Sequence, residues 1–260
     1  VLIILNKLGF SSTIVLFDKI DEYQDLNQDI TKIAAFTSEL LTDTELLLNN
    51  KLSIGFSLWS ELRAELSGTV RFDKFGFIDV RWKSGDMKFL IDKRIKYFSL
   101  NNDKSLEDLI EDKYDRDEII KLANKSPRDL ISLLGSIYQE QANYNENVNC
   151  FDDSCISSGM ISFCENYDYD SIYPWKAGRN KEIKAMINRI LAVRLTRFTV
   201  KDLNRTFKQS NAQSDGQIKL MKSYKLIRED DILGGDNKKI YEILDPKVEY
   251  LIKRIVIKIE

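Results

Sequence analysis

Histidine is missing from all 260 residues. Without an imidazole, the chain cannot carry a Ser–His–Asp triad, a histidine general base or a histidine metal site. Its three cysteines, Cys150, Cys155 and Cys164, lack the paired Cys-x-x-Cys spacing of a zinc site, and we interpret them as free thiols of a cytoplasmic protein. No apolar run reaches the length of about 18 residues that a membrane span needs, so none is expected.

The sequence also lacks a glycine-rich loop of the form G-x-x-x-x-G-K-[ST], whose backbone N–H groups hold nucleotide phosphates. The chain does not begin with Met, and a strand pattern follows soon after its start. Its length suits about two domains. These features predict a fragment of a longer protein.

The net charge of −2 conceals two parts of opposite sign. Residues 176–260 carry 20 Lys and Arg against 11 Asp and Glu, whereas the rest of the chain carries 19 against 30. Residues 144–175 contain six acids and no base. This asymmetry predicts an anion-binding C-terminal domain.

The stretch from Ile14 to Glu22 carries the first candidate site. Its apolar run ends at Asp18, a pattern typical of a strand buried on both faces of a parallel sheet. Carboxylates after such a strand lie at the edge where open α/β sheets bind ligands. Asp18 is therefore a candidate Mg²⁺ ligand, and Asp21 or Glu22 could position a water for attack on a γ-phosphate. The alternative is a buried strand that runs into a solvated acidic loop.

The run Asp18-Lys19-Ile20-Asp21-Glu22 resembles the Walker B motif of P-loop ATPases. Its Asp-x-x-Asp-Glu form is most similar to the AAA and STAND branches, including origin-recognition-like and NACHT-type ATPases. The resemblance implies ATP and Mg²⁺ as cofactors of the intact protein, with Mg²⁺ on Asp18 and the lytic water on Glu22 or, less favourably, Asp21. It also places the phosphate-binding loop upstream of residue 1, so this fragment alone is expected to be inactive.

Further elements follow this strand. Residues 25–50 are predicted to be helical, and residues 51–58 form a second strand that ends near Ser57. The resemblance gives Ser57 the sensor 1 position, which touches the γ-phosphate or the attacking water. A strand-end serine satisfied by its own surroundings is the alternative.

A third strand is predicted over residues 77–82, where β-branched and aromatic residues lie between Gly76 and Gly85. Short helices are predicted near residues 60–66, 87–98, 106–110 and 117–123. Ser126-Pro127-Arg128 opens another helix, with Ser126 as N-cap and Pro127 at the first helical position. The resemblance makes Arg128 a sensor 2 residue that reaches the nucleotide phosphates, and a capped helix with an exposed arginine is the alternative.

The C-terminal region has the element order of a winged-helix domain. The predicted order is a helix over 182–195, helices over 199–208 and 212–224, strands over 226–228 and 239–244, and a final helix after Asp245-Pro246. Thr199 and Asp202 form the pattern of a capping box, and Gly234-Gly235 marks the hairpin between the strands.

In a helix-turn-helix arrangement the helix over 212–224 would enter the major groove of DNA, where Gln pairs with adenine and Lys with guanine or phosphate. The candidate nucleic-acid contacts are Arg205, Lys208, Gln213, Gln217, Lys219, Lys222, Lys238 and Lys239. Asp215 on the same helix would repel phosphate. A winged helix that packs on the ATPase core or on a protein partner therefore stays open.

The sequence thus predicts an α/β partial P-loop NTPase core with a helical lid, followed by an α+β winged-helix domain. The expected domains are residues 1–100 for the core, 101–143 for the lid, 144–181 for an acidic linker with one helix, and 182–260 for the winged helix. The expected function is an ATP-dependent switch that couples nucleotide state to the winged helix. The alternatives are a DNA-binding regulator and a nucleotide-independent interaction module that self-associates or binds a protein.

Overall fold

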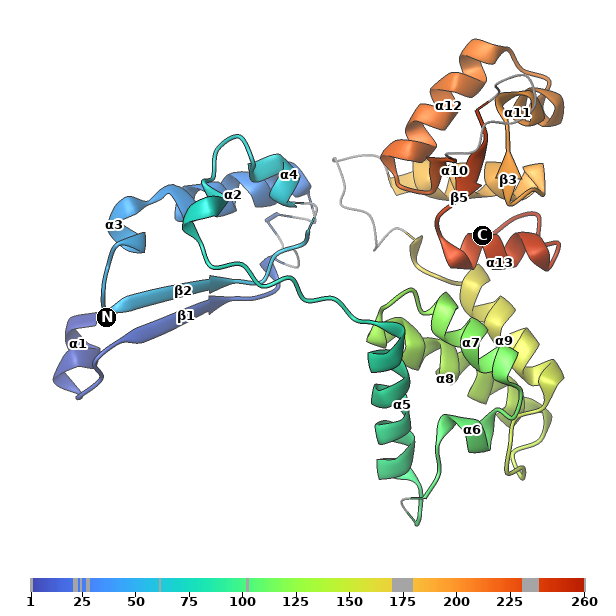
Figure 1. Ribbon diagram of the computed structural model, residues 1–260, viewed down its shortest axis with the longest axis horizontal. Coiled ribbons are helices and arrows are strands. Elements are labelled where there is room, and N and C mark those ends of the chain that lie inside the picture. Colours follow the sequence, from blue (N-terminus) through green and yellow to red (C-terminus); the bar gives the residue numbers. More distant parts are fainter. Residues whose placement is uncertain are drawn as a thin grey trace. The chain divides into compact units, whose positions relative to one another are not determined.

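The computed structural model describes residues 2–20, 23, 25–26, 29–60, 62–101, 103–169, 180–230 and 239–259. The chain divides into two compact units between Asp79 and Val80 (Figure 1). This division falls earlier than the expected end of the core near residue 100. The helices from residue 84 to residue 165 and the C-terminal elements belong to one unit.

The first unit is built on two parallel strands joined by a helical crossover. Its elements are α1 (Leu2–Lys7), β1 (Thr13–Phe17), α2 (Ile30–Thr42), α3 (Thr44–Leu47), β2 (Leu52–Phe56), α4 (Leu62–Leu66) and the 3₁₀ turn η2 (Phe72–Lys74). The register pairs Thr13 with Leu52 and Phe17 with Phe56. Asp29 caps α2 by accepting from the N–H groups of Thr31 and Lys32. The predicted pair of strands with a helix between them is confirmed.

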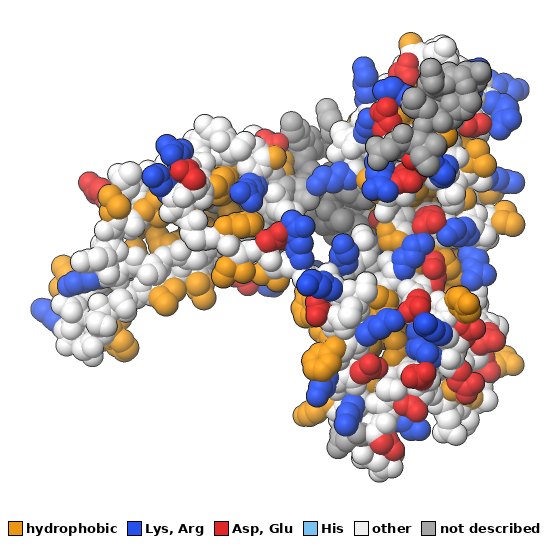
Figure 2. Space-filling model, in the orientation of Figure 1, with side chains coloured by type: hydrophobic (Ala, Val, Ile, Leu, Met, Phe, Trp, Pro, Cys, Tyr) orange, Lys and Arg blue, Asp and Glu red, His pale blue; other side chains and the backbone are white. Residues whose placement is uncertain are grey.

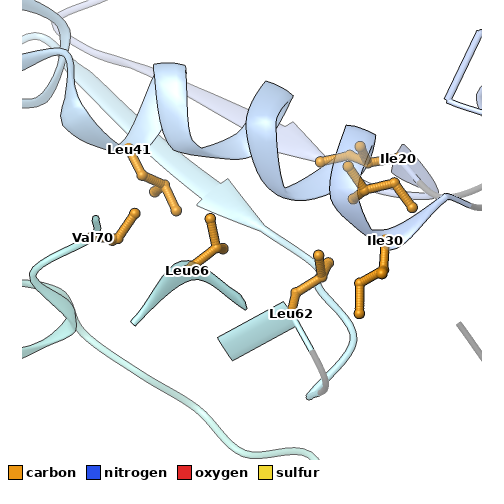
Figure 3. Close-up of a cluster of buried hydrophobic side chains, with 7 residues drawn as sticks. Ile20, Ile30, Leu41, Leu62, Leu66 and Val70 are labelled. Atoms are coloured by element: carbon orange, nitrogen blue, oxygen red, sulfur yellow. The ribbon is translucent and has the colours of Figure 1, made fainter. Parts of the chain in front are cut away.

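An apolar cluster joins α2 and α4 to the end of the sheet (Figure 3). Its buried members are Ile20, Ile30, Ile33, Leu41, Leu62, Leu66 and Val70. Phe17 and Phe56 pack against this cluster and stack on each other with ring centroids 4.9 Å apart. The cluster fixes the ends of β1 and β2, where the candidate site begins.

The expectation that β1 is buried on both faces is wrong in this chain. Ile14 and Leu16 point to one face of the sheet and remain 69% and 77% exposed. Because successive strand residues alternate between faces, Phe17 packs on the opposite side, against the cluster. Among the described elements, the helices cover only that side.

The prediction of a strand over residues 77–82 is also wrong, because these residues form no strand. Phe77, Ile78 and Val80 are exposed. A strand needs a hydrogen-bonding neighbour, and none of the described strands pairs with this segment. The segment instead crosses the division between the two units.

The second unit begins with a helical layer that comprises α5 (Ser84–Phe98), α6 (Leu106–Leu109), α7 (Lys113–Leu122), α8 (Pro127–Tyr144) and α9 (Asp153–Glu165). The expected cap of α8 is confirmed, since the Ser126 hydroxyl accepts from the Asp129 N–H at 3.1 Å. The helix expected inside the acidic segment is confirmed as α9, which packs along α8. Gly159 permits this close approach, because a Cβ there would lie 2.5 Å from the Cα of Ile137.

The C-terminal elements are α10 (Asn180–Val193), β3 (Arg197–Phe198), α11 (Val200–Phe207), α12 (Asn211–Ser223), β4 (Ile227–Glu229), β5 (Tyr241–Ile243) and α13 (Pro246–Lys253). Their strands form an antiparallel sheet of order β3-β5-β4. Asp202 accepts from the N–H and the hydroxyl of Thr199, both at 2.8 Å, as the capping box predicts. The two-residue β3 was missed in the sequence, and the expected hairpin falls largely in residues 231–238, outside the described residues.

Helix α13 packs against α7 and α9. Its Lys247 is 1% exposed, and the Lys247 ammonium lies 3.6 Å from the Asp129 carboxylate and 4.2 Å from the ring centroid of Tyr167. The Tyr167 hydroxyl donates to the same carboxylate at 2.8 Å. This Lys247 cluster, formed by Lys247, Asp129 and Tyr167, ties the start of α8 to α13.

Candidate functional site

The structure brings Asp18 and Ser57 to the ends of two neighbouring parallel strands. Phe17 and Phe56 are the last paired residues of β1 and β2, and the Ser57 N–H donates to the Phe17 carbonyl at 2.9 Å. Asp18 and Ser57 therefore follow the strands side by side, and both are exposed. The arrangement presents a carboxylate and a hydroxyl at the carboxyl edge of the sheet, where α/β folds bind ligands.

The backbone turns sharply after Asp18. Its carboxylate accepts from the Lys19 N–H at 3.0 Å, and Lys19 adopts a left-handed conformation with φ of 55°. Ile20 then returns to the apolar cluster and anchors the loop. Asp21 and Glu22, the candidate water-positioning residues, lie outside the described residues.

Any metal at this edge would depend on Asp18. Among the described residues, no three Cys, Asp or Glu side chains gather as a metal cage. A Mg²⁺–nucleotide site does not require one, since Mg²⁺ keeps several waters and takes one or two carboxylates together with phosphate oxygens. Asp18 fits that limited role, and the rest of the coordination would come from waters and the nucleotide.

The candidate sensor Arg128 occupies the first turn of α8 in the second unit and is exposed. Its neighbour Asp129 is directed into the Lys247 cluster. Any displacement of this turn would therefore act on α13 through Asp129. The buried lysine was missed in the sequence, because a Lys in the first turn of an amphipathic helix carries no local sign of burial.

The two glutamines expected to contact bases are engaged within the C-terminal elements. The side-chain oxygen of Gln213 accepts from the Ser210 N–H at 2.9 Å. Gln217 and Gln209 exchange two hydrogen bonds, at 2.9 and 3.1 Å. These bonds hold both side chains against the protein, so a base contact by either would compete with them.

The expected cations divide into paired and unpaired groups. Lys222 and Lys239 both contact Glu229, at 3.2 and 2.8 Å, and their hydrogen bonds lower the pKa of that carboxyl. Arg205 lies 3.3 Å from Asp202 but remains largely exposed. Lys208, the left-handed cap of α11, and Lys219 on α12 are exposed without a carboxylate within 4.0 Å among the residues described. Lys238 lies outside the described residues.

The three cysteines are free, as expected. Burial raises the pKa of the Cys164 thiol far above its ordinary value. None of the described helices combines the length and the apolar character that crossing a bilayer requires.

No family model matches this sequence. No curated protein matches it either. Among solved structures, the chain is similar to the Aeropyrum pernix ORC1 protein, whose structure was determined in complex with DNA. The TM-score is 0.43 at 12% identity, and the match covers 93% of this chain and 63% of that one. The chain thus spans less than two thirds of the length of that protein. A likeness this distant assigns no function to the present chain.

Proposed function

We propose that the chain is the C-terminal part of an ATP-dependent switch of the AAA or STAND type. The observation that carries the proposal is that Asp18 and Ser57 directly follow the last paired residues, Phe17 and Phe56, at the carboxyl ends of β1 and β2. A parallel pair with a helical crossover and a carboxylate at this edge suits a Mg²⁺–phosphate site. A glycine-rich phosphate-binding loop, which these 260 residues do not contain, must complete it.

The proposal gives each candidate residue a defined chemical role. The Asp18 carboxylate would hold Mg²⁺ directly or through water, and Glu22 or Asp21 would orient and deprotonate the attacking water. The Ser57 hydroxyl detects the γ-phosphate at the same sheet edge. The Arg128 guanidinium binds β- or γ-phosphate oxygens and so reports the presence of nucleotide to α8.

The output of the switch is the winged helix of residues 182–260. The order helix, strand, two helices and two strands, with an antiparallel sheet, supports this assignment. The Lys247 cluster provides a path from Arg128 to this module, because Asp129 contacts both Lys247 and Tyr167.

The test is ATP turnover by the protein extended upstream through its phosphate-binding loop. We expect Glu22→Gln to slow turnover by a factor of about 10² to 10⁴, as for removal of a general base. Asp18→Asn should raise the Mg²⁺ concentration needed for half-maximal turnover, because one carboxylate ligand is lost. Asp25→Asn, at an exposed position, serves as a control that leaves turnover unchanged. Equal turnover by the parent protein and the Glu22→Gln variant would remove Glu22 from the mechanism.

Duplex DNA binding is the second candidate function, favoured by the exposed cations Arg205, Lys208 and Lys219 on α11, its cap and α12. If these side chains contact phosphates, replacing each with Gln should flatten the dependence of log K on log salt by about 0.9. Lys32→Gln on α2 is the matched control. Unchanged salt dependence in the triple variant would favour the remaining alternative, a protein-interaction module.

A further inference from the structure

Helix α5 presents an exposed face on which two basic side chains lie between two aromatic ones. Its opposite face carries Met87 and Ile91, which are buried, and α5 packs against α7 and α8. At about 100° per residue, Phe89, Lys93, Lys96 and Tyr97 fall on the side away from this contact. Figure 2 shows apolar and basic side chains interleaved over α5.

The aromatic rings on this face are unusually open. Phe89 is 65% exposed and Tyr97 76% exposed. The Lys93 ammonium lies 5.3 Å from the ring centroid of Phe89. This cation therefore lies beside an exposed ring, where a planar anionic ligand could contact both.

The charge on this face is not neutralised within the molecule. Lys93 and Lys96 have no carboxylate within 4.0 Å in the part of the chain that the structure describes. Lys88 differs, since it pairs with Asp117 at 2.6 Å. Both acids of α5 are engaged elsewhere. Asp86 accepts from the Lys83 N–H at the start of the helix at 3.0 Å, and the Asp92 carboxylate accepts from the Leu106 N–H at 2.9 Å.

We propose that this α5 face, formed by Phe89, Lys93, Lys96 and Tyr97, binds single-stranded nucleic acid. Unpaired bases stack on exposed aromatic rings without regard to sequence, while cations between the rings hold the phosphates. Phe89 and Tyr97 are eight positions apart, which places the rings about 12 Å apart along the helix axis. That separation lets two alternate bases of an extended strand reach the two rings.

Two other partners fit this face less well. A membrane-surface helix needs a continuous apolar stripe, whereas Lys93 and Lys96 interrupt the stripe here. Duplex DNA keeps its bases stacked on one another and offers no free base faces to Phe89 and Tyr97. The proposal is independent of the ATPase assignment, since no residue of the α5 face belongs to the nucleotide site.

The test measures binding of the full chain to a labelled oligothymidylate of about 16 nucleotides by fluorescence anisotropy at low salt. Phe89→Ala and Tyr97→Ala should each weaken binding about tenfold, the loss expected for removing one stacking ring. Lys93→Gln and Lys96→Gln should each flatten the salt dependence by about 0.7 in log K against log salt. Because all four side chains are exposed, the variants should keep the parent circular dichroism and melting temperature.

Tyr138→Ala is the matched control, because Tyr138 is an exposed aromatic residue of α8 away from the α5 face. It should leave oligothymidylate binding unchanged. The proposal is overturned if the chain does not bind the oligonucleotide, or if the Phe89→Ala, Tyr97→Ala double variant binds as well as the parent. It is also overturned if Arg205→Gln abolishes oligonucleotide binding while that double variant keeps it. Cosedimentation of the chain with phosphatidylserine vesicles, without binding to the oligonucleotide, would overturn it as well.

Discussion

Gly159 is the residue at which the packing of α9 on α8 has least freedom. An added Cβ would lie 2.5 Å and 2.7 Å from the backbone Cα and N of Ile137. Because backbone atoms of a helix cannot yield as a side-chain end can, Gly159→Ala must push the two helices apart. We expect it to lower the free energy of unfolding by about 2 kcal/mol, measured by urea denaturation.

Gly135 on α8 provides the matched control for that substitution. It is helical, and a Cβ there would meet nothing within 4 Å. Gly135→Ala should therefore raise the free energy of unfolding by about 0.5–1 kcal/mol, since Gly is the poorer helix former. A Gly159→Ala variant as stable as Gly135→Ala would show that α8 and α9 do not approach as closely as described.

Lys247 shows what a buried charge requires of its neighbours. Among the described carboxylates, only that of Asp129 lies within 4.0 Å of its ammonium. Asp129→Asn would leave the cation buried without an opposite charge, and we expect a loss of about 3 kcal/mol in unfolding free energy. Adding Lys247→Met to that variant should restore much of the loss, because the unpaired charge is then removed.

An exposed ion pair gives the comparison for this experiment. Arg71 and Asp73 lie 2.8 Å apart with both side chains largely in solvent. Solvent screens such a pair, so Asp73→Asn should leave urea denaturation unchanged within error. If Asp129→Asn also left the free energy of unfolding unchanged, the Lys247 cluster would not contribute to stability.

At the scale of elements, the sequence predicts most helices well and the strands only in part. The caps at Ser126 and Thr199 are local signals, because each uses a side chain within three residues of the N–H groups that it satisfies. The strand expected over residues 77–82 has the right composition, but strand formation depends on a partner that local composition cannot supply. The two-residue β3 is too short for any periodicity to reveal.

The junction between α7 and α13 should respond to acid. Burial alone would raise the pKa of Glu249, but hydrogen bonds from Lys253 and Lys121 outweigh it and lower that pKa. The carboxylate lies 2.7 Å from the Lys253 ammonium and 2.9 Å from that of Lys121. A group with a depressed folded pKa contributes stability above its unfolded value of about 4.3, and this contribution is lost as the pH falls through the folded pKa.

We therefore expect Glu249→Gln to lower the melting temperature at neutral pH. The difference from the parent should shrink as the pH falls below about 4.3, because the parent carboxyl then becomes protonated as well. Thermal denaturation followed by circular dichroism across this range measures it. Glu146→Gln, at an exposed position, is the control. A melting-temperature difference between Glu249→Gln and the parent that stayed constant to about one pH unit below 4.3 would contradict the role given to the Glu249 carboxylate.

At the scale of the whole molecule, local pattern identifies residues at strand ends but not surfaces assembled by packing. Asp18 and Ser57 each follow a predicted strand, and the register of β1 and β2 places them side by side. Their roles in nucleotide chemistry stay a prediction. The Lys247 cluster joins residues more than 100 positions apart, and the openness of the α5 face depends on where Met87 and Ile91 pack. Neither can be derived from one stretch of sequence.

The segment between the two units should be the first site of limited proteolysis by chymotrypsin. Phe77 and Trp82 lie in non-helical, unpaired backbone and are exposed, so a protease can bind this backbone in the extended form that cleavage needs. Phe89 and Tyr97 are as exposed but helical, and their backbone hydrogen bonds should protect them. N-terminal sequencing of the large product should therefore find Ile78 or Lys83.

That product should unfold cooperatively, because it contains the buried residues of α8, α9 and α13. The Phe77→Ser, Trp82→Ser double variant should resist this cleavage, and early cleavage after Phe89 or Tyr97 instead would show that α5 opens more readily than the segment before it.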